Sequence, residues 1–191
     1  RLWRIRASQI VTATGAIERP LSFAGNDVPG VMLAGSMRDY VVNWGINPGQ
    51  RVVVATNNDD AYRTALVLHD AGVEVVRVID TRESGGGALM EAVREKGIRV
   101  ELGRAIAKVK DGKCVTEVAI CAQNGEGGAR EVVQADAVAM SGGWSPVVHL
   151  WSHCGGKLNW DTVNANFRPD PERPPLGHGG KGFVVAAGAA N

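Results

Sequence analysis

The sequence contains few of the residues that would indicate a disulfide framework, a redox-active dithiol or a metal site. It has three cysteines, Cys114, Cys121 and Cys154, which is an odd number with no C-x-x-C spacing. We therefore expect buried, unreactive thiols in a reducing, cytoplasmic compartment. His149 and His153 would share a helix face, but no third ligand lies near them in the sequence, so we expect no metal.

Long apolar runs and an excess of charge are also absent. No run reaches the ~18 residues of a membrane span, and the net charge is +1. Neither a membrane nor a nucleic acid is therefore expected as a partner. The composition, 45% hydrophobic and 21% charged, is ordinary for a soluble globular protein. The sequence starts with Arg1 and has strand-like runs near both ends, so we expect a piece of a longer polypeptide.

Residues 51–82 give the strongest indication of the fold. Val52 to Ala55 form a β-branched run of the kind found in a buried parallel strand. A helical segment follows, and Val73 to Ile79 form a second apolar run that leads to Asp80. A strand, a helix and a second strand with an acidic residue about 20 positions on form the βαβ unit of a dinucleotide-binding domain. In such a domain the acidic residue holds the ribose 2′-OH.

The glycines of the dinucleotide fingerprint are missing from this unit. Where G-x-G-x-x-G/A is expected, the best alignment gives Thr56, Asn58 and Ala61, of which only Ala61 conforms. Thr and Asn place Cβ atoms where the backbone has to approach a pyrophosphate. Two interpretations follow. Either the domain binds NAD, with Asp80 on the ribose and Thr56 and Asn58 donating to phosphate, or it is a retained scaffold without a cofactor.

The helix ends are predicted from capping residues. Asp59 or Asp60 is expected to cap the helix after the first strand, and Gly72 is expected to end it in a left-handed conformation. A further helix is expected over Gly35–Asn43, behind a Ser36 cap.

The remaining pattern predicts an α/β, Rossmann-like three-layer domain with a parallel sheet and an antiparallel meander. A helix is expected over 88–96, strands over 98–102 and 136–140, the meander over 105–109, 115–121 and 130–133, a glycine-rich turn over 141–146, and a helix over 147–154. A small hairpin element and a buried strand are expected within residues 2–13, and loops over 155–160 and 164–175.

Two turns near the chain ends are similar to the cofactor contacts of two-domain flavoprotein reductases. One is Ala13-Thr14-Gly15-Ala16, followed by Pro20, and the other is Gly188–Ala189 after an apolar run at 183–187. A glycine permits close backbone approach, and a proline fixes the direction in which the chain leaves. We therefore expect strands from an incomplete outer dinucleotide-binding domain at both ends.

Taken together, the segments resemble the α subunits of heterotetrameric sarcosine oxidases, in a group that includes opine dehydrogenase and cyanide synthase subunits. The matching segments are IVTATGAIERPLSFAGNDVPGVMLAGS at 10–36, VVVATNNDDAYRTAL at 52–66, SGGWSPVVHL at 141–150, GGKLNWD at 155–161 and VAAGAAN at 185–191. The match covers essentially the whole chain, and TNNDDAYRTAL and SGGWSP are specific to this group.

The resemblance implies a complex that oxidises sarcosine to glycine with oxygen as acceptor and passes the one-carbon unit to tetrahydrofolate. It implies β, γ and δ subunits as partners, FAD and FMN mainly on one of these partners, and tetrahydrofolate bound outside this stretch. NAD is implied in the outer-domain pocket, next to Thr14, Gly15, Gly188 and Ala189. No catalytic residue is carried over, because the amine would be oxidised at a flavin on another chain.

The implied domains are 1–45, the end of the outer domain with a linker; 46–146, an inserted NAD-domain-like Rossmann domain; and 147–191, the return to the outer domain. Because the first βαβ of the outer domain is missing here, we expect the isolated chain to bind NAD weakly or not at all and to be inactive. The alternative is a degenerate Rossmann module that serves as a scaffold or subunit-docking domain.

Overall fold

The computed structural model describes residues 1–110, 112–126, 128–129 and 131–191, and the chain divides into two compact units. The central unit is Glu18–Gly143, and the flanking unit is Arg1–Ile17 together with Trp144–Asn191. The predicted ranges 1–45, 46–146 and 147–191 assign segments of the chain to an outer and an inserted dinucleotide-binding domain. This assignment stays a prediction.

The central unit is built on a five-stranded parallel sheet with the strand order β3-β10-β4-β5-β6. A separate antiparallel sheet has the order β7-β8-β9. The elements of this unit are β3 (Val31–Leu33), α1 (Ala34–Trp44), β4 (Arg51–Thr56), α2 (Asp60–Asp70), β5 (Glu74–Asp80), α3 (Gly87–Glu95), β6 (Val100–Leu102), β7 (Arg104–Val109), β8 (Glu117–Ala122), β9 (Glu131–Gln134) and β10 (Ala137–Ser141).

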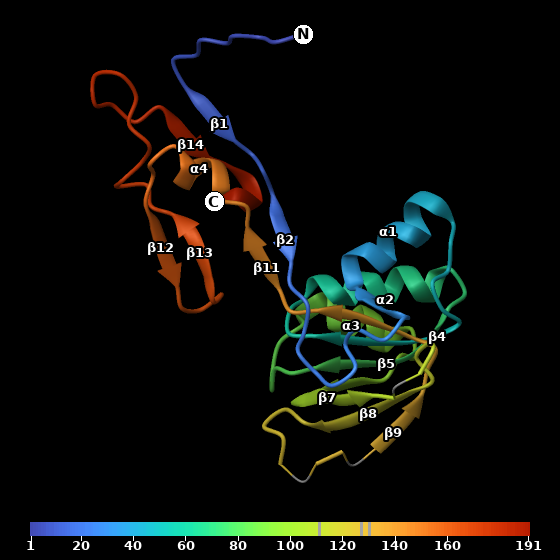
Figure 1. Ribbon diagram of the computed structural model, residues 1–191. Helices are drawn as coiled ribbons and strands as arrows, with labels where there is room; N and C mark the ends of the chain where they lie inside the picture. The colour runs from blue at the N-terminus through green and yellow to red at the C-terminus, as the bar shows by residue number, and fades with distance from the viewer. Residues whose placement is uncertain (111, 127, 130) are drawn as a thin grey trace. The chain divides into compact units, whose positions relative to one another are not determined.

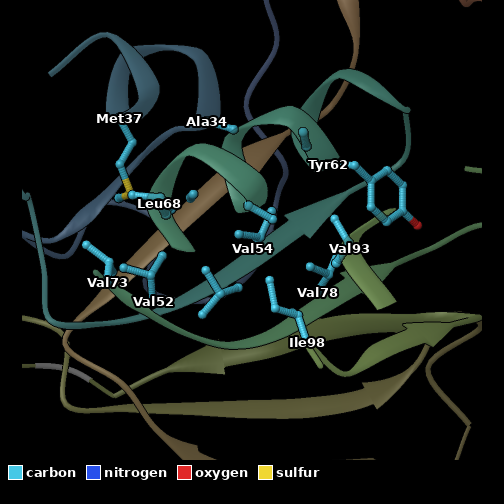
Figure 2. Packing of buried hydrophobic residues seen from close by; sticks show 14 of the residues in the cluster. Ala34, Met37, Val52, Val54, Tyr62, Leu68, Val73, Val78, Val93 and Ile98 are labelled. Atoms are coloured by element: carbon cyan, nitrogen blue, oxygen red, sulfur yellow. The ribbon is translucent and has the colours of Figure 1, made fainter. Parts of the chain in front are cut away.

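The parallel sheet is the middle of three layers, with α1, α2 and α3 on one face and the β7-β8-β9 meander on the other (Figure 1). On the helix side Val54 and Val78 of the sheet pack with Leu68 of α2 and Val93 of α3, all fully buried (Figure 2). On the meander side Val53 packs in a second cluster with residues of β7, β8 and β9. Apolar side chains of β4 therefore pack on both faces of the sheet, which explains why this strand is a continuous β-branched run.

The predicted α/β, Rossmann-like architecture is therefore confirmed, and several details are corrected. Ser36 lies inside α1, which starts at Ala34 without a side-chain cap. The edge strand β3 was assigned to no element in the sequence, because three residues are too few to show a period. Gly72 has the expected positive φ of 82°. Of the predicted meander, Arg130 lies outside the described residues, as do Asp111 and Gly127 of the predicted turns.

The flanking unit contains short, mostly exposed elements. Its parallel pair is β1 with β14, and its antiparallel pair is β12 with β13. The elements are β1 (Ile10–Thr12), β11 (Trp144–Pro146), α4 (His149–His153), β12 (Leu158–Asp161), β13 (Asn166–Pro169), β14 (Val184–Ala186) and a 3₁₀ turn η1 (Gly188–Ala190), and β2 (Ala16–Glu18) leads into the central unit.

Three predictions for the flanking unit are wrong. No hairpin forms within residues 1–9, all of which the structure describes, and Ile10 and Val11 are 42% and 60% exposed, so the first strand is not a buried one. The predicted loops around residue 160 contain the β12-β13 hairpin instead. Trp160 and Phe167 pack edge to face across it with their ring centroids 4.9 Å apart, and a cross-strand aromatic pair of this kind stabilises a short hairpin.

Candidate functional site

The carboxyl ends of the central strands form one edge of the parallel sheet. Met140 of β10 lies beside Leu33 of β3, and Ser141 lies beside Thr56 of β4. Thr56 in turn lies beside Asp80 of β5. Ligands of open α/β sheets bind at this edge. It is therefore the candidate site of the central unit, and it holds the Thr56 and Asp80 that the sequence singled out.

The turn after β4 is held closed by its own side chains. The Thr56 hydroxyl accepts a hydrogen bond from the backbone N–H of Asn58 at 3.0 Å and donates one to the carbonyl of the same residue at 2.9 Å. The side-chain amide of Asn58 donates to the Ser141 hydroxyl at 2.9 Å. Thr56 is also fully buried. The polar groups of this turn therefore bind one another and β10, in the place where a fingerprint would present bare backbone to a pyrophosphate.

Asp80 is completely buried, and both of its carboxylate oxygens accept hydrogen bonds. Oδ2 accepts from the Tyr62 hydroxyl at 2.8 Å and from Nη2 of Arg82 at 2.7 Å. Oδ1 accepts from the backbone N–H of Arg82 at 2.9 Å and from its Nε at 3.0 Å. A ribose diol that bound Asp80 would have to displace Arg82.

Tyr62 and Arg82 keep their protons in this arrangement. Burial raises the pKa of the Tyr62 hydroxyl above its ordinary 10.0, and the hydrogen bond to Asp80 acts in the same direction. The hydrogen bonds to Asp80 raise the pKa of the Arg82 guanidinium. In Figure 2 the Tyr62 hydroxyl points away from the other labelled core residues. Tyr62 thus closes the apolar core with its ring and reaches the buried carboxylate with its hydroxyl.

Arg82 also connects the sheet edge to two helices. Its Nη2 lies 2.7 Å from Oδ1 of Asp59, the residue before α2. The same Oδ1 accepts a hydrogen bond at 3.2 Å from the backbone N–H of Gly86, the residue before α3. The prediction that Asp59 or Asp60 caps α2 is therefore wrong, because the Asp59 carboxylate is directed to Arg82 and Gly86, and α2 has no side-chain cap.

Each of the three helices that begin at this edge has a carboxylate of the protein at its N-terminus. Oε2 of Glu18 accepts a hydrogen bond from the backbone N–H of Gly35, in the first turn of α1, at 2.8 Å. Asp60 is the first residue of α2, and the Asp59 carboxylate accepts a hydrogen bond from the backbone N–H of Gly86, the residue before α3. A helix N-terminus favours one anion and holds the pyrophosphate in dinucleotide domains. Asp59 is paired with Arg82 at 2.7 Å and Asp60 with Arg38 at 3.0 Å, so a pyrophosphate would have to compete with these carboxylates for the arginines, and the residues present do not fit a dinucleotide.

Glu18 is a buried member of this set, and its burial alters its titration. Burial raises the pKa of its carboxyl above the ordinary 4.5, while hydrogen bonding with Ser141 and Gly35 acts in the opposite direction. Its Oε1 is buried and has no hydrogen-bond partner among the described residues. The carboxyl therefore keeps its proton to a higher pH than an exposed glutamate does.

The other four predicted contact residues lie in the flanking unit, at one end of its parallel strand pair. Thr12 of β1 lies opposite Ala186 of β14. The turns that follow the two strands, Thr14–Gly15 and Gly188–Ala189, therefore leave the pair at the same end. Gly15 and Gly188 have φ angles of 76° and 64°, and a Cβ added at either would meet nothing within 4 Å.

Hydrogen bonds fix the first of these turns. The Thr14 hydroxyl donates to the Val147 carbonyl at 2.6 Å, and the Val147 N–H donates to the Gly15 carbonyl at 2.9 Å. Ala189 is exposed in the 3₁₀ turn. Open space over two left-handed glycines suits close approach of a ligand to backbone. The two turns of the flanking unit thus leave backbone accessible, whereas the turn after β4 is filled by its own side chains.

Other candidate chemistry is limited. Among the residues that the structure describes, no three His, Cys, Asp or Glu side chains gather in a way that could hold a metal ion. The three thiols are free, and only Cys121 is buried; Cys114 and Cys154 are exposed, contrary to the expectation of buried thiols. No helix in the described ranges is both long and apolar enough to cross a membrane.

Three residues of the sheet edge were missed by the sequence reasoning. Tyr62 and Arg82 bind Asp80, and Glu18 reaches α1 from another part of the chain. Arg82 follows Asp80 by two residues, and this spacing was the available signal. Nothing in the sequence pairs Glu18 with Gly35, because a contact between a short strand and a later helix depends on the tertiary fold.

Curated proteins similar to this chain are chains of multi-subunit oxidases. The sarcosine oxidase α subunit of Rhizobium meliloti (strain 1021) is 41% identical over an alignment of 192 positions, which covers 100% of this chain and 18% of that protein. The α subunit of the sarcosine oxidase from Corynebacterium sp. (strain P-1) is 43% identical over an alignment of 174 positions, which covers 89% of this chain and 18% of that protein. An opine oxidase chain of Agrobacterium tumefaciens (strain Ach5) is 31% identical over an alignment of 182 positions, which covers 86% of this chain and 36% of that protein. No protein-family model matches.

Solved structures share the fold at low sequence identity. Thioredoxin reductase from T. acidophilum aligns with a TM-score of 0.71 and 18% identity over 96% of this chain and 58% of that one. L-proline dehydrogenase from P. horikoshii aligns with a TM-score of 0.66 and 22% identity, over 96% of this chain and 30% of that one. The chain spans 18% of the length of the sarcosine oxidase α subunits that it matches, and it is a homologue of that segment of them.

Proposed function

We propose that the chain is part of an amine-oxidising oxidoreductase of the sarcosine oxidase type, in which the flanking unit borders an NAD pocket and the central unit binds no cofactor. The observation that carries the proposal is the set of carboxylates at the three helix N-termini of the central sheet edge, Glu18, Asp59 and Asp60. A pyrophosphate needs that position, and it would have to compete there with carboxylates that are already paired with Arg82 and Arg38.

The whole enzyme of this proposal oxidises sarcosine to glycine with oxygen as acceptor and transfers the one-carbon unit to tetrahydrofolate. It contains β, γ and δ subunits, with FAD and FMN mainly on a partner. The cofactors supply the redox chemistry when bound, and tetrahydrofolate accepts the one-carbon unit. The contribution of this chain is positional: the backbone at Gly15 and Gly188, held by the β1-β14 pair, lines the edge of the NAD pocket.

NAD titration of this chain and of a polypeptide that also carries the outer domain tests the proposal. We expect no NAD binding by this chain and measurable binding by the longer polypeptide. In the longer polypeptide Gly188→Val should weaken NAD binding, because it places a branched side chain in the open space above the backbone. Asn58→Ala in the central turn should leave NAD binding unchanged. Loss of NAD binding with Asn58→Ala and not with Gly188→Val would refute the assignment.

A second candidate role for the central unit is docking of another chain of the complex, and exposed apolar residues near the C-terminal end of α1 support it. Tyr40, Val42 and Trp44 of α1 and Ile46 after it are 43%, 63%, 72% and 52% exposed. Tyr and Trp are the residues that most often dominate binding energy at protein interfaces. In co-expression with the partner subunits, Trp44→Ala should reduce recovery of the assembled complex, whereas Arg94→Ala on the exposed side of α3 should not.

A further inference from the structure

We infer that Arg82 is the residue that keeps the ribose end of the central sheet edge closed to nucleosides. The inference rests on the proposed absence of a cofactor in the central unit, and it names one side chain as the cause at the ribose end. In dinucleotide-binding domains an acidic residue at the end of the second strand accepts a hydrogen bond from the ribose 2′-OH. Asp80 stands at that position, at the end of β5, so the acid is retained and only its access is in question.

Burial shows which side chain covers Asp80. The Asp80 side chain is 0% exposed, whereas that of Arg82 is 29% exposed. Four hydrogen bonds from Arg82 to the carboxylate lie between 2.7 and 3.2 Å, and they come from its backbone N–H, its Nε and its Nη2. The guanidinium is therefore the part of this pair that meets solvent. The Arg82 side chain fills acceptor positions on both oxygens and the Tyr62 hydroxyl fills another on Oδ2, so a ribose 2′-OH that donated to Asp80 would have to replace one of these donors.

Asp59 holds Arg82 in this closed arrangement. Its Oδ1 lies 2.7 Å from Nη2 of Arg82 and also accepts from the backbone N–H of Gly86. Asp59 is about half exposed, at 51%, so it forms the outer side of the bridge. The guanidinium thus spans the gap from the end of β5 to the start of α2, which in a working domain lies between the ribose and the pyrophosphate.

The class of ligand that an opened site would take follows from the charges. Removal of Arg82 leaves Asp80 as an acceptor for a ribose diol, but Asp59 and Asp60 remain at the N-terminus of α2. Asp60 stays paired with Arg38, but Asp59 would lose its arginine partner, and its exposed charge would repel a phosphate there. An uncharged nucleoside such as adenosine is therefore the expected ligand of the opened site, and NAD is not.

Adenosine titration of the full chain by calorimetry tests the inference with Arg82→Ala, and with Arg94→Ala as the matched control. Arg94 is also an arginine in an ion pair, with Glu91 on the surface of α3. Arg82→Ala should bind adenosine at least about tenfold more tightly than the wild type, since a hydrogen bond to a charged group is worth about that factor. The control should not differ from the wild type.

The outcomes separate this inference from the proposed function. If folded Arg82→Ala, checked by circular dichroism, binds adenosine no better than the wild type, Arg82 is not the cause of closure. If Arg82→Ala does not fold, Asp59→Asn decides: a gain in adenosine binding supports the inference, and no gain overturns it. If the wild-type chain itself binds NAD and Asp59→Asn changes that affinity, the proposed function fails as well.

Discussion

Tyr62→Phe measures how strongly the buried carboxylate at the sheet edge depends on its tyrosine. The substitution removes only the hydroxyl that donates to Asp80 at 2.8 Å, and the ring of Tyr62, which is fully buried, keeps its packing. A hydrogen bond to a charged group is worth about 1.5–3 kcal/mol. Because Arg82 still neutralises Asp80, we expect the lower part of that range, about 1.5–2 kcal/mol of lost unfolding free energy.

Chemical denaturation followed by far-UV circular dichroism measures this loss. Tyr40→Phe is the control, since it makes the same chemical change on α1 at a side chain that is 43% exposed. A surface change of this kind should stay within about 0.5 kcal/mol of the wild type. In heating experiments each kcal/mol should lower Tm by roughly 2–4 °C for a chain of this size.

The pH dependence of the free energy of unfolding independently tests whether the Tyr62 hydroxyl stabilises the fold. The pKa of Tyr62 is raised in the folded state, so above pH 10.0 the unfolded chain loses this proton first and the fold loses stability as pH rises. Tyr62→Phe lacks this contribution. The difference in the free energy of unfolding between wild type and variant should therefore become smaller above pH 10.0. A loss under about 0.5 kcal/mol, equal to that of Tyr40→Phe, would show that the hydroxyl does not support Asp80.

Two further substitutions probe the same edge of the sheet. The raised pKa of Glu18 means that the folded state keeps this proton longer, so Glu18 should make the free energy of unfolding fall as pH rises from 4.5, against the rise contributed by carboxylates with lowered pKa such as Glu117, and Glu18→Gln should remove the Glu18 contribution from urea midpoints measured across this range. A pH dependence that is unchanged in Glu18→Gln would assign it to other groups. Gly142→Ala places a Cβ 2.7 Å from the Pro20 carbonyl oxygen and 3.0 Å from that of Arg19, so it should cost about 1–3 kcal/mol in denaturation experiments, whereas Gly112→Ala, whose nearest contact is at 3.6 Å, should be close to neutral.

The fold could be predicted where the sequence pattern is long and regular. The run at Val52–Ala55 is buried on both faces, as its β-branched composition indicates, and α2 and β5 follow within a residue or two of the expected ranges. Short elements were missed for a physical reason. β3 and the strands of the β12-β13 hairpin are three and four residues long, and such strands are selected by tertiary pairing more than by local preference.

Only part of the candidate site could be predicted from the sequence. The loss of fingerprint glycines at Thr56 and Asn58 indicated a damaged turn, and the structure shows how the new side chains fill it. The sequence predicted an acidic residue at position 80, but it did not predict that the Asp80 carboxylate is buried and hydrogen-bonded. A buried carboxylate held by Tyr62 and Arg82 and an exposed carboxylate ready for a ribose have the same sequence signature, because burial is decided by neighbours from other elements.

The carboxylates explain why the central fold can persist without a nucleotide. In a dinucleotide domain the bound phosphate neutralises the positive end of a helix, so its loss leaves unpaired N–H groups at a buried edge. Here Glu18 and Asp59 accept hydrogen bonds from Gly35 and Gly86, and the residual negative charge of Asp59 is matched by Arg82. At the starts of α1 and α3, protein carboxylates thereby accept from N–H groups that would otherwise lie unpaired at this edge. If this reasoning is correct, adding NAD should not raise the Tm of the chain. A rise in Tm on addition of NAD would show that the edge still stabilises itself with a cofactor.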